Sequence, residues 1–367
     1  MKRLRQLVLL GQSIWYDYID RPLLNSGRLA ALVQAGVVQG VTSNPAIFHK
    51  ALQQGDVYAE AIAYWRAQGV RDPVALYEHV VVQDIQDACD VLRPLYERTH
   101  GFDGFVSLEV NPHLAYDPEA TVAEARRLWE WVGRPNLLIK IPATEPGLEA
   151  IATAIAEGIP VNATLIFSVP RYRAVADAYL RGLEQRLERG LSLDVPSVAS
   201  FFVSRLDTKV DRLLQTRIDA GGAEAEEARS LLGRIAISNA RQAYQAFKAI
   251  FASERFARLA AAGARVQRLL WASTSTKNPA YPDTKYVDAL IGPNTINTMP
   301  PHTWEAFADH GTPRLTLEED PIGDAMRLVA LPELGIDLDE ITRELEEEGV
   351  HAFVRAFDSL VATLAAA

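Results

Sequence analysis

The 367-residue sequence contains one cysteine, Cys89, which excludes an internal disulfide and any metal site built from clustered cysteines. Its seven histidines are scattered and form no helical His-x-x-x-His pair, so a zinc site of that kind has no support. No apolar stretch approaches the roughly 18 residues of a membrane span. The basic, apolar start is interrupted at Gly11 and Gln12, and it predicts a first strand instead of a signal peptide. We therefore expect a cytoplasmic protein with no metal and no membrane partner.

The charge balance also limits the partners. The formal net charge is −10, and this field repels nucleic acids and anionic membranes, so we expect neither to bind. An anionic substrate such as a sugar phosphate would need a local cluster of cationic and hydrogen-bonding groups. Apolar residues make up 49% of the chain, which is typical of a globular protein with a sizeable core.

Short apolar runs alternate with helical patterns along the chain. The runs are LVLLGQSIWYD, VVQGVTSNP, FDGFVSLEVNP, NLLIKIPAT, IPVNATLIFS, SVASFFVSR, VQRLLWASTS and NTINTMPP. Eight such units predict an α/β fold, a single (β/α)8 TIM barrel with extra helices that spans residues 1–367. A doubly wound open sheet is the alternative, but no Gly-x-Gly-x-x-Gly turn supports it.

The helical patterns between and after the runs predict the outer layer. Helices are expected at 119–131, 147–155 and 171–187, and the Ala/Glu/Arg-rich segment 224–262 predicts one or two more. The tail, 338–364, predicts a closing helix.

Polar residues share one face of strand after strand. Ser107 and Glu109 have the parity opposite to Val106 and Leu108, because side chains alternate along a strand. The same count groups polar residues in the other runs: Ser13 with Asp17, Thr42 with Asn44, Asn162 with Thr164, Ser200 with Phe202 and Ser204, and Ser273 with Ser275. These residues cluster near the carboxyl ends of the strands, where barrel enzymes have their active sites. Ordinary turn propensity is the alternative explanation for any single strand.

Lys140 stands inside the apolar string LLIKI. A lysine in such surroundings is poorly solvated, and desolvation favours the neutral amine, which is nucleophilic toward a carbonyl. The alternative is a lysine on an edge strand whose ammonium reaches solvent. Glu109 and Asp17, on other strands, could transfer protons. A core ion pair between Glu109 and Lys140, and a surface position for Asp17, are the structural alternatives.

Several ordered motifs resemble the transaldolase family. GVTSNP, SLEVNP, LIKIPAT, VNATLIFS and SFFVSRLD occur in the family's order, and ASTSTKNP and NTINTMPP resemble its longer bacterial branch. The resemblance covers the chain from Gly11 to about Pro301. It implies a class I aldolase barrel, rearranged in strand order so that the Schiff-base lysine lies on the fourth strand, where the fourth run carries Lys140.

The resemblance also implies roles for individual residues. Lys140 would form the Schiff base, Asp17 would act as acid and base on a substrate hydroxyl, and Glu109 with Thr164 would hold a proton-shuttling water. Asn44, Asn162 and Ser200 would bind the hydroxyls of a dihydroxyacetone unit.

Arg205 would bind the phosphate, since a guanidinium matches paired phosphate oxygens. The family's shorter branch has an arginine close after Ala-Ser on strand seven, where this chain has Ser273–Lys277, so Ser273 and Lys277 are the predicted second phosphate contact. A solvated lysine is the alternative for Lys277.

The predicted activity is transfer of a dihydroxyacetone unit between phosphorylated sugars, from a ketose donor to an aldose acceptor, with no cofactor and no metal. A monomer and a homodimer are both compatible with the sequence. One alternative is a fructose-6-phosphate aldolase-like lyase; those proteins are much shorter and resemble a barrel with tyrosine where this chain has Phe202. The other is a non-catalytic sugar-phosphate-binding protein.

Overall fold

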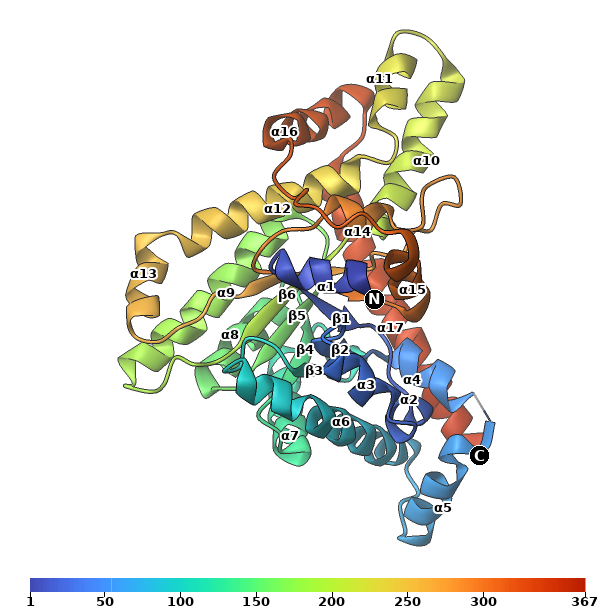
Figure 1. The fold of residues 1–367 in the computed structure, drawn as a ribbon, viewed down its shortest axis with the longest axis vertical. Helices are drawn as coiled ribbons and strands as arrows, with labels where there is room; N and C mark the ends of the chain where they lie inside the picture. Colours follow the sequence, from blue (N-terminus) through green and yellow to red (C-terminus); the bar gives the residue numbers. More distant parts are fainter. Residues whose placement is uncertain (54, 367) are drawn as a thin grey trace.

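Eight parallel strands form a closed barrel in the computed structural model, which describes residues 1–53 and 55–366 (Figure 1). The strands follow one another around the barrel in chain order, and β8 closes it by pairing with β1, Thr295 opposite Gln12. Their bounds are β1 Gln12–Tyr16, β2 Gly40–Thr42, β3 Phe105–Glu109, β4 Leu137–Pro142, β5 Val161–Ile166, β6 Ser197–Phe202, β7 Arg268–Ala272 and β8 Thr295–Met299. Each of the eight apolar runs contains one strand, so the predicted (β/α)8 barrel is confirmed, with Lys140 on the fourth strand.

Helices surround this barrel, and several begin at side-chain caps that are visible in the sequence. Three of these caps accept a hydrogen bond from the backbone N–H three residues later: Asp72, Asp117 and Ser168. A proline directly follows each of the two aspartates, and a Val-Pro pair follows the serine. The helices up to the fifth strand are α1 Lys2–Leu9, α2 Arg21–Asn25, α3 Arg28–Gln34, α4 Pro45–Leu52, α5 Ala59–Ala67, α6 Pro73–Arg98, α7 Pro118–Val132 and α8 Gly147–Glu157. Those after it are α9 Val169–Glu188, α10 Ser204–Ala220, α11 Glu224–Leu231, α12 Ile235–Phe251, α13 Glu254–Ala261, α14 Lys285–Ala289, α15 Pro301–His310, α16 Pro321–Ala330 and α17 Leu338–Ala366, and three short 3-10 turns lie at η1 Gly55–Tyr58, η2 Pro112–Leu114 and η3 Leu331–Leu334. The helices expected at 119–131, 147–155 and 171–187 correspond to α7, α8 and α9.

The start of the chain differs from the prediction. Residues 2–9 form helix α1 instead of part of the first strand, because Leu4 and Leu7, three residues apart, bury one helical face in the core. The strand begins only after Gly11, whose φ of 86° lies in the left-handed region. A Cβ there would also lie 3.0 Å from the Pro293 backbone, so glycine suits this turn on both counts.

The segment 224–262 contains three helices, where one or two were expected. Gly233, with φ 66°, separates α11 from α12, and Ser253 begins α13 by accepting a hydrogen bond from the Phe256 N–H. In Figure 1, α10 and α11 extend together away from the barrel.

The predicted closing helix is present as α17, which packs against α4, α6, α10 and β5 (red in Figure 1). Among the described residues it is the one helix long and apolar enough, by length and composition, to span a membrane. Arg355 and Asp358 interrupt its apolar stretch, so the sequence contains no continuous apolar run there. One third of that stretch, 33%, is buried inside the fold.

Candidate active site

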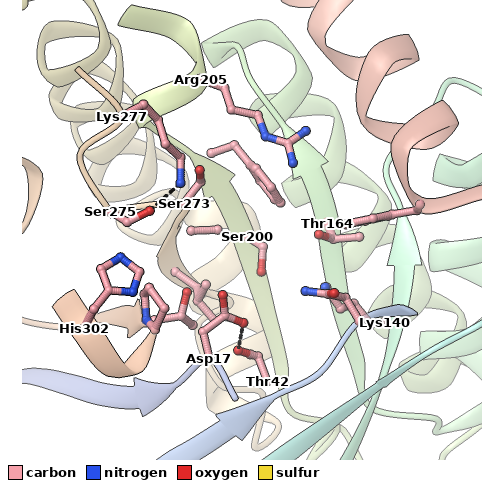
Figure 2. Close-up of a pocket in the computed structure, with 17 residues that line it drawn as sticks. Asp17, Thr42, Lys140, Thr164, Ser200, Arg205, Ser273, Ser275, Lys277 and His302 are labelled. Carbon is pink, nitrogen blue, oxygen red and sulfur yellow. Dashed lines mark hydrogen bonds between the residues drawn. The ribbon is translucent and has the colours of Figure 1, made fainter. Parts of the chain in front are cut away.

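A cavity of about 240 Å3 opens among the carboxyl ends of the strands. All but two of the predicted site residues line it: Asp17, Asn44, Lys140, Thr164, Ser200, Phe202, Arg205, Ser273 and Lys277. The two exceptions, Glu109 and Asn162, lie directly behind this lining and contact Lys140 and Ser200 respectively. Figure 2 shows Arg205 and Lys277 toward one end of the cavity and Lys140 and Asp17 toward the other.

Lys140 is buried near the end of β4, with 6% of its side chain exposed. Its Nζ donates to Glu109 Oε2 and to the Ser43 carbonyl, both at 3.2 Å, and lies 5.3 Å from the centre of the Phe353 ring. The barrel is closed, so β4 is not an edge strand and the alternative of a lysine reaching solvent is wrong. The ion pair with Glu109, the alternative considered for that carboxylate, is present.

Burial raises the pKa of the Glu109 carboxyl to about 6, against the opposing effect of the Lys140 ammonium. Within the part of the chain that the structure describes, its Oε1 is buried and has no hydrogen-bond partner, and the same holds for Thr164 Oγ1 on β5. Buried polar atoms are nearly always paired. Two orphaned atoms beside the lysine therefore identify a place where a small polar molecule would be bound.

Asp17 follows β1 directly, and its backbone N–H donates to the Met299 carbonyl at 2.9 Å. Thr42 on β2 donates its hydroxyl to Asp17 Oδ1 at 2.7 Å, which fixes the carboxylate at the cavity wall (Figure 2). Asn44 caps α4 by accepting the Ile47 N–H with its amide oxygen. Its amide NH2 group is the part left to donate to a ligand.

A chain of hydrogen bonds crosses the barrel interior beneath the cavity. Ser200 donates to Asn162 Oδ1 at 2.7 Å, and Asn162 Nδ2 donates to Ser107 at 3.0 Å. Ser107 and Asn162 lie on β3 and β5, which are not neighbours, so their side chains meet inside the barrel as the parity count predicts. Asn162 is fully buried and does not line the cavity. Its hydrogen-bond partner Ser200 does line the cavity.

Two cations converge at the other end of the cavity. Arg205, at the start of α10, lies 5.7 Å from the centre of the Phe202 ring, and within the described chain no carboxylate forms an ion pair with it. Lys277 is exposed at the rim, but its ammonium turns into the cavity and donates to Ser275 (Figure 2). Burial lowers the pKa of both groups, and the nearby Arg205 charge further lowers that of Lys277. An anion bound between them would relieve this repulsion.

Ser273, the residue after β7, is hydrogen-bonded to Ser204 at the start of α10. Its φ of 55° is unusual for a residue other than glycine, and its carbonyl accepts the Ser204 N–H at 3.0 Å. The two serine hydroxyls lie 3.1 Å apart. This turn holds the Ser273–Lys277 segment against Arg205.

The cavity also contains residues that the sequence analysis did not assign to it. They are Thr42, Leu270, Ala272, Ser275, Thr298, Pro300, His302 and Phe353. Strand parity groups Thr42 and Ser275 with predicted site residues near the carboxyl ends, although the sequence assigns them no role. His302 follows β8 and Phe353 lies on α17, and nothing in their local sequence indicates that they line this cavity.

The closed barrel, with a buried lysine and carboxylate at the carboxyl ends of its strands, has the architecture of a (β/α)8 barrel enzyme. The chain matches the model of the Transaldolase/Fructose-6-phosphate aldolase family over residues 14–364 and belongs to that family.

Curated relatives match over nearly their whole length. A protein named Transaldolase from Parafrankia sp. (strain EAN1pec) is 49% identical over 99% of this chain and 97% of its own, and one from Thermobifida fusca (strain YX) is 50% identical over 98% and 96%. A protein named Transaldolase 2 from Streptomyces coelicolor (strain ATCC BAA-471 / A3(2) / M145) is 48% identical over 98% of this chain and 95% of its own.

Proposed function

We propose that this protein is a transaldolase of the non-oxidative pentose phosphate pathway. It transfers a dihydroxyacetone unit from sedoheptulose 7-phosphate to glyceraldehyde 3-phosphate, and gives erythrose 4-phosphate and fructose 6-phosphate. The observation that carries the proposal is the buried Lys140, 3.2 Å from Glu109, in a cavity that also has Asp17 at its wall and two cations at its far end.

The first step is attack of the neutral Lys140 amine on the ketose carbonyl carbon. Glu109 is placed to accept the proton that the ammonium gives up, since its Oε2 is already the hydrogen-bond partner of Nζ. The resulting carbinolamine loses water to form an iminium ion. The unpaired Glu109 Oε1 and Thr164 Oγ1 support a shared water that carries protons in this step.

The second step breaks the bond between C3 and C4 of the ketose. Asp17 accepts the proton of the C4 hydroxyl, the C3–C4 electron pair moves to the iminium nitrogen, and the aldose departs while an enamine stays on Lys140. The acceptor aldehyde then reacts in reverse, with Asp17 returning the proton to the new hydroxyl. Thr42 supports this role because its hydrogen bond at 2.7 Å orients the carboxylate.

The phosphate group would lie between Arg205 and Lys277. Because the two cations and Lys140 lie toward opposite ends of the cavity (Figure 2), the site suits a ligand that carries its charge at one end, as a ketose phosphate does. Asn44 and Ser200, which also line the cavity, would bind the hydroxyls of the dihydroxyacetone unit.

Release of free dihydroxyacetone, as by a fructose-6-phosphate aldolase, is the closest alternative, because the matched family includes both activities. Phe202, where such lyases resemble a barrel with tyrosine, lies in the cavity wall and favours transfer. The three relatives described above match over almost their entire length and are each named a transaldolase, which also favours it.

Borohydride trapping with fructose 6-phosphate tests the proposal. The wild-type protein should form one covalent adduct, mapped to Lys140, and should transfer the three-carbon unit to erythrose 4-phosphate. Lys140→Ala should lose both activities while keeping its fold by circular dichroism, because the lysine is a nucleophile and burial favours the protonated form of the Glu109 carboxyl that stays behind. Lys248→Ala, a surface lysine on α12, is the matched control and should behave as wild type.

Two outcomes would overturn it. Substantial transfer by Lys140→Ala would remove the lysine from the mechanism, and the absence of any adduct in the wild-type protein would favour a non-catalytic binding protein.

A further inference from the structure

Phe353 is the one aromatic side chain that α17 places over the reacting lysine. It lines the cavity, is 6% exposed, and has its ring centre 5.3 Å from Lys140 Nζ. Together with the barrel wall it leaves 6% of the Lys140 side chain and 2% of the Glu109 side chain exposed. The apolar ring therefore separates the nitrogen from solvent on the side that faces α17.

The position of this ring is fixed one turn earlier in the helix. Gly349 lies four residues before Phe353, on the same face, and a Cβ there would lie 2.8 Å from the Leu165 side chain of β5. Glycine thus allows α17 to approach the barrel closely at this point. Leu165 has a φ of 61° and lies within an irregularity of the β5–β6 register. The end of β5 therefore departs from regular strand geometry at the point where it contacts α17.

One turn later, a second aromatic residue holds the helix. Phe357 makes an edge-to-face contact with Tyr77 of α6, with ring centres 5.6 Å apart, and lies outside the cavity that contains Lys140. Asp358 also forms an ion pair with His113. Phe353 is held between these two docking points, which makes its place over Lys140 a fixed feature of the fold.

We propose that Phe353 decides the fate of the three-carbon intermediate, favouring its transfer to an aldose over its loss to water. This inference rests on the proposed function and concerns the stage after the first aldose has left, when the enamine on Lys140 waits for an acceptor.

Loss of the intermediate requires two additions. A proton must add to C3 of the enamine to regenerate the iminium ion, and water must then add to C2. The C2–N bond breaks as the carbinolamine collapses, and the products are dihydroxyacetone and the Lys140 ammonium. Both additions draw on solvent, so an apolar cover over the lysine slows them. Transfer needs neither a new proton at C3 nor bulk water before the acceptor binds.

The ring contributes a second effect through its charge distribution. The face of an aromatic ring attracts a cation, and the iminium nitrogen would replace the ammonium at about the same position. The attraction stabilises the iminium ions of the donor and of the transfer product. Because it stabilises the iminium ion formed by protonation at C3 equally, the preference for transfer rests on the exclusion of solvent.

The test measures the ratio of free dihydroxyacetone to transferred product, with fructose 6-phosphate as donor and erythrose 4-phosphate as acceptor. This ratio does not depend on how much of a variant is folded. Phe353→Ala should raise the ratio about tenfold or more, and Phe353→Leu, which keeps an apolar cover, should raise it less. Phe251→Leu on α12 is the matched control, since it loses aromatic packing against Phe247 and Phe256 outside the cavity and should keep the wild-type ratio.

Gly349→Ala provides a second route to the same answer if Phe353→Ala does not fold. Its added Cβ should push α17 away from Leu165 and raise the ratio in the same direction. Wild-type transfer together with an unchanged ratio in Phe353→Leu and Gly349→Ala would overturn this inference alone. A wild-type protein that neither forms the borohydride adduct nor transfers would overturn the proposed function and this inference with it.

Discussion

At the scale of single residues, Glu109 has the most informative titration. Burial raises the pKa of this carboxyl to about 6. Lys140 can pass its proton to Glu109 only while the carboxylate is ionised, so the rate should be full above pH 6 and should fall as the pH drops through about 6. Glu109→Gln should lose this acidic limb and lower turnover by roughly 10²–10⁴-fold, the usual effect of removing a general acid or base.

The measurement is kcat and kcat/KM between pH 4.5 and 8 for both proteins. Sugar affinity should change little, because glutamine keeps the size and some of the hydrogen bonding of glutamate. Unchanged turnover in Glu109→Gln would reduce this residue to a structural partner of Lys140.

Arg205 should determine affinity for the phosphate group. It lines the cavity without a carboxylate partner within the described chain, so its charge is available to a ligand. Removing a charge-assisted contact of about 1.5–3 kcal/mol should weaken binding roughly 10- to 150-fold. Arg205→Ala should therefore raise KM for phosphorylated sugars far more than for dihydroxyacetone, an unphosphorylated donor.

Lys277→Ala should show the same pattern, more weakly, because an ammonium is a point charge and lacks the paired donors of a guanidinium. Equal losses for phosphorylated and unphosphorylated donors would mean that these two residues shape the cavity and do not bind the phosphate. Retained affinity in Lys277→Ala alone would assign the phosphate to Arg205.

At the scale of secondary-structure elements, the sequence predicts the barrel well because its signal is local. Each strand is a short apolar run with polar residues of one parity, and parity alone indicates that Ser107 and Asn162 face the interior, where they are hydrogen-bonded across the barrel. The apolar flanks of Lys140 indicate a nucleophilic amine and the position of Glu109 indicates a proton-transfer group, while the family resemblance adds their particular roles. The two residues do lie in contact.

Elements whose placement depends on distant contacts were harder to predict. Residues 2–9 resemble a strand in composition, but Leu4 and Leu7 bury a helical face against the core. Phe353 lies more than 200 residues from Lys140 in the chain, and its position depends on how α17 docks on β5. Neither effect has a signal in the local sequence, because both depend on tertiary packing.

At the scale of the whole molecule, the two ends of the barrel have different tasks. The cavity lies at the carboxyl end, whereas a buried ion pair joins Arg268 at the start of β7 to Asp103 before β3, with Nη1 3.2 Å from Oδ1. Arg268 also donates to Ser13 on β1 at 2.6 Å and to the Thr295 carbonyl at 2.9 Å. The Arg268 guanidinium thus links β7 to β1, to β8 and to the residue two positions before β3, at the end of the barrel opposite the cavity.

This division predicts a variant that loses stability and keeps its catalytic constants. Arg268→Ala would leave the buried Asp103 carboxylate without its cationic partner, with Ser13 Oγ still donating to Oδ2 at 2.8 Å. Breaking a buried ion pair in this way typically costs about 3–5 kcal/mol. We expect a free energy of unfolding lower by that amount in urea titration, with kcat and KM per folded molecule unchanged. An Arg268→Ala, Asp103→Ala double variant should regain part of the loss, because it removes the unpaired charge. A change in KM, or in the ratio of free dihydroxyacetone to transferred product, would show that the two ends of the barrel are coupled.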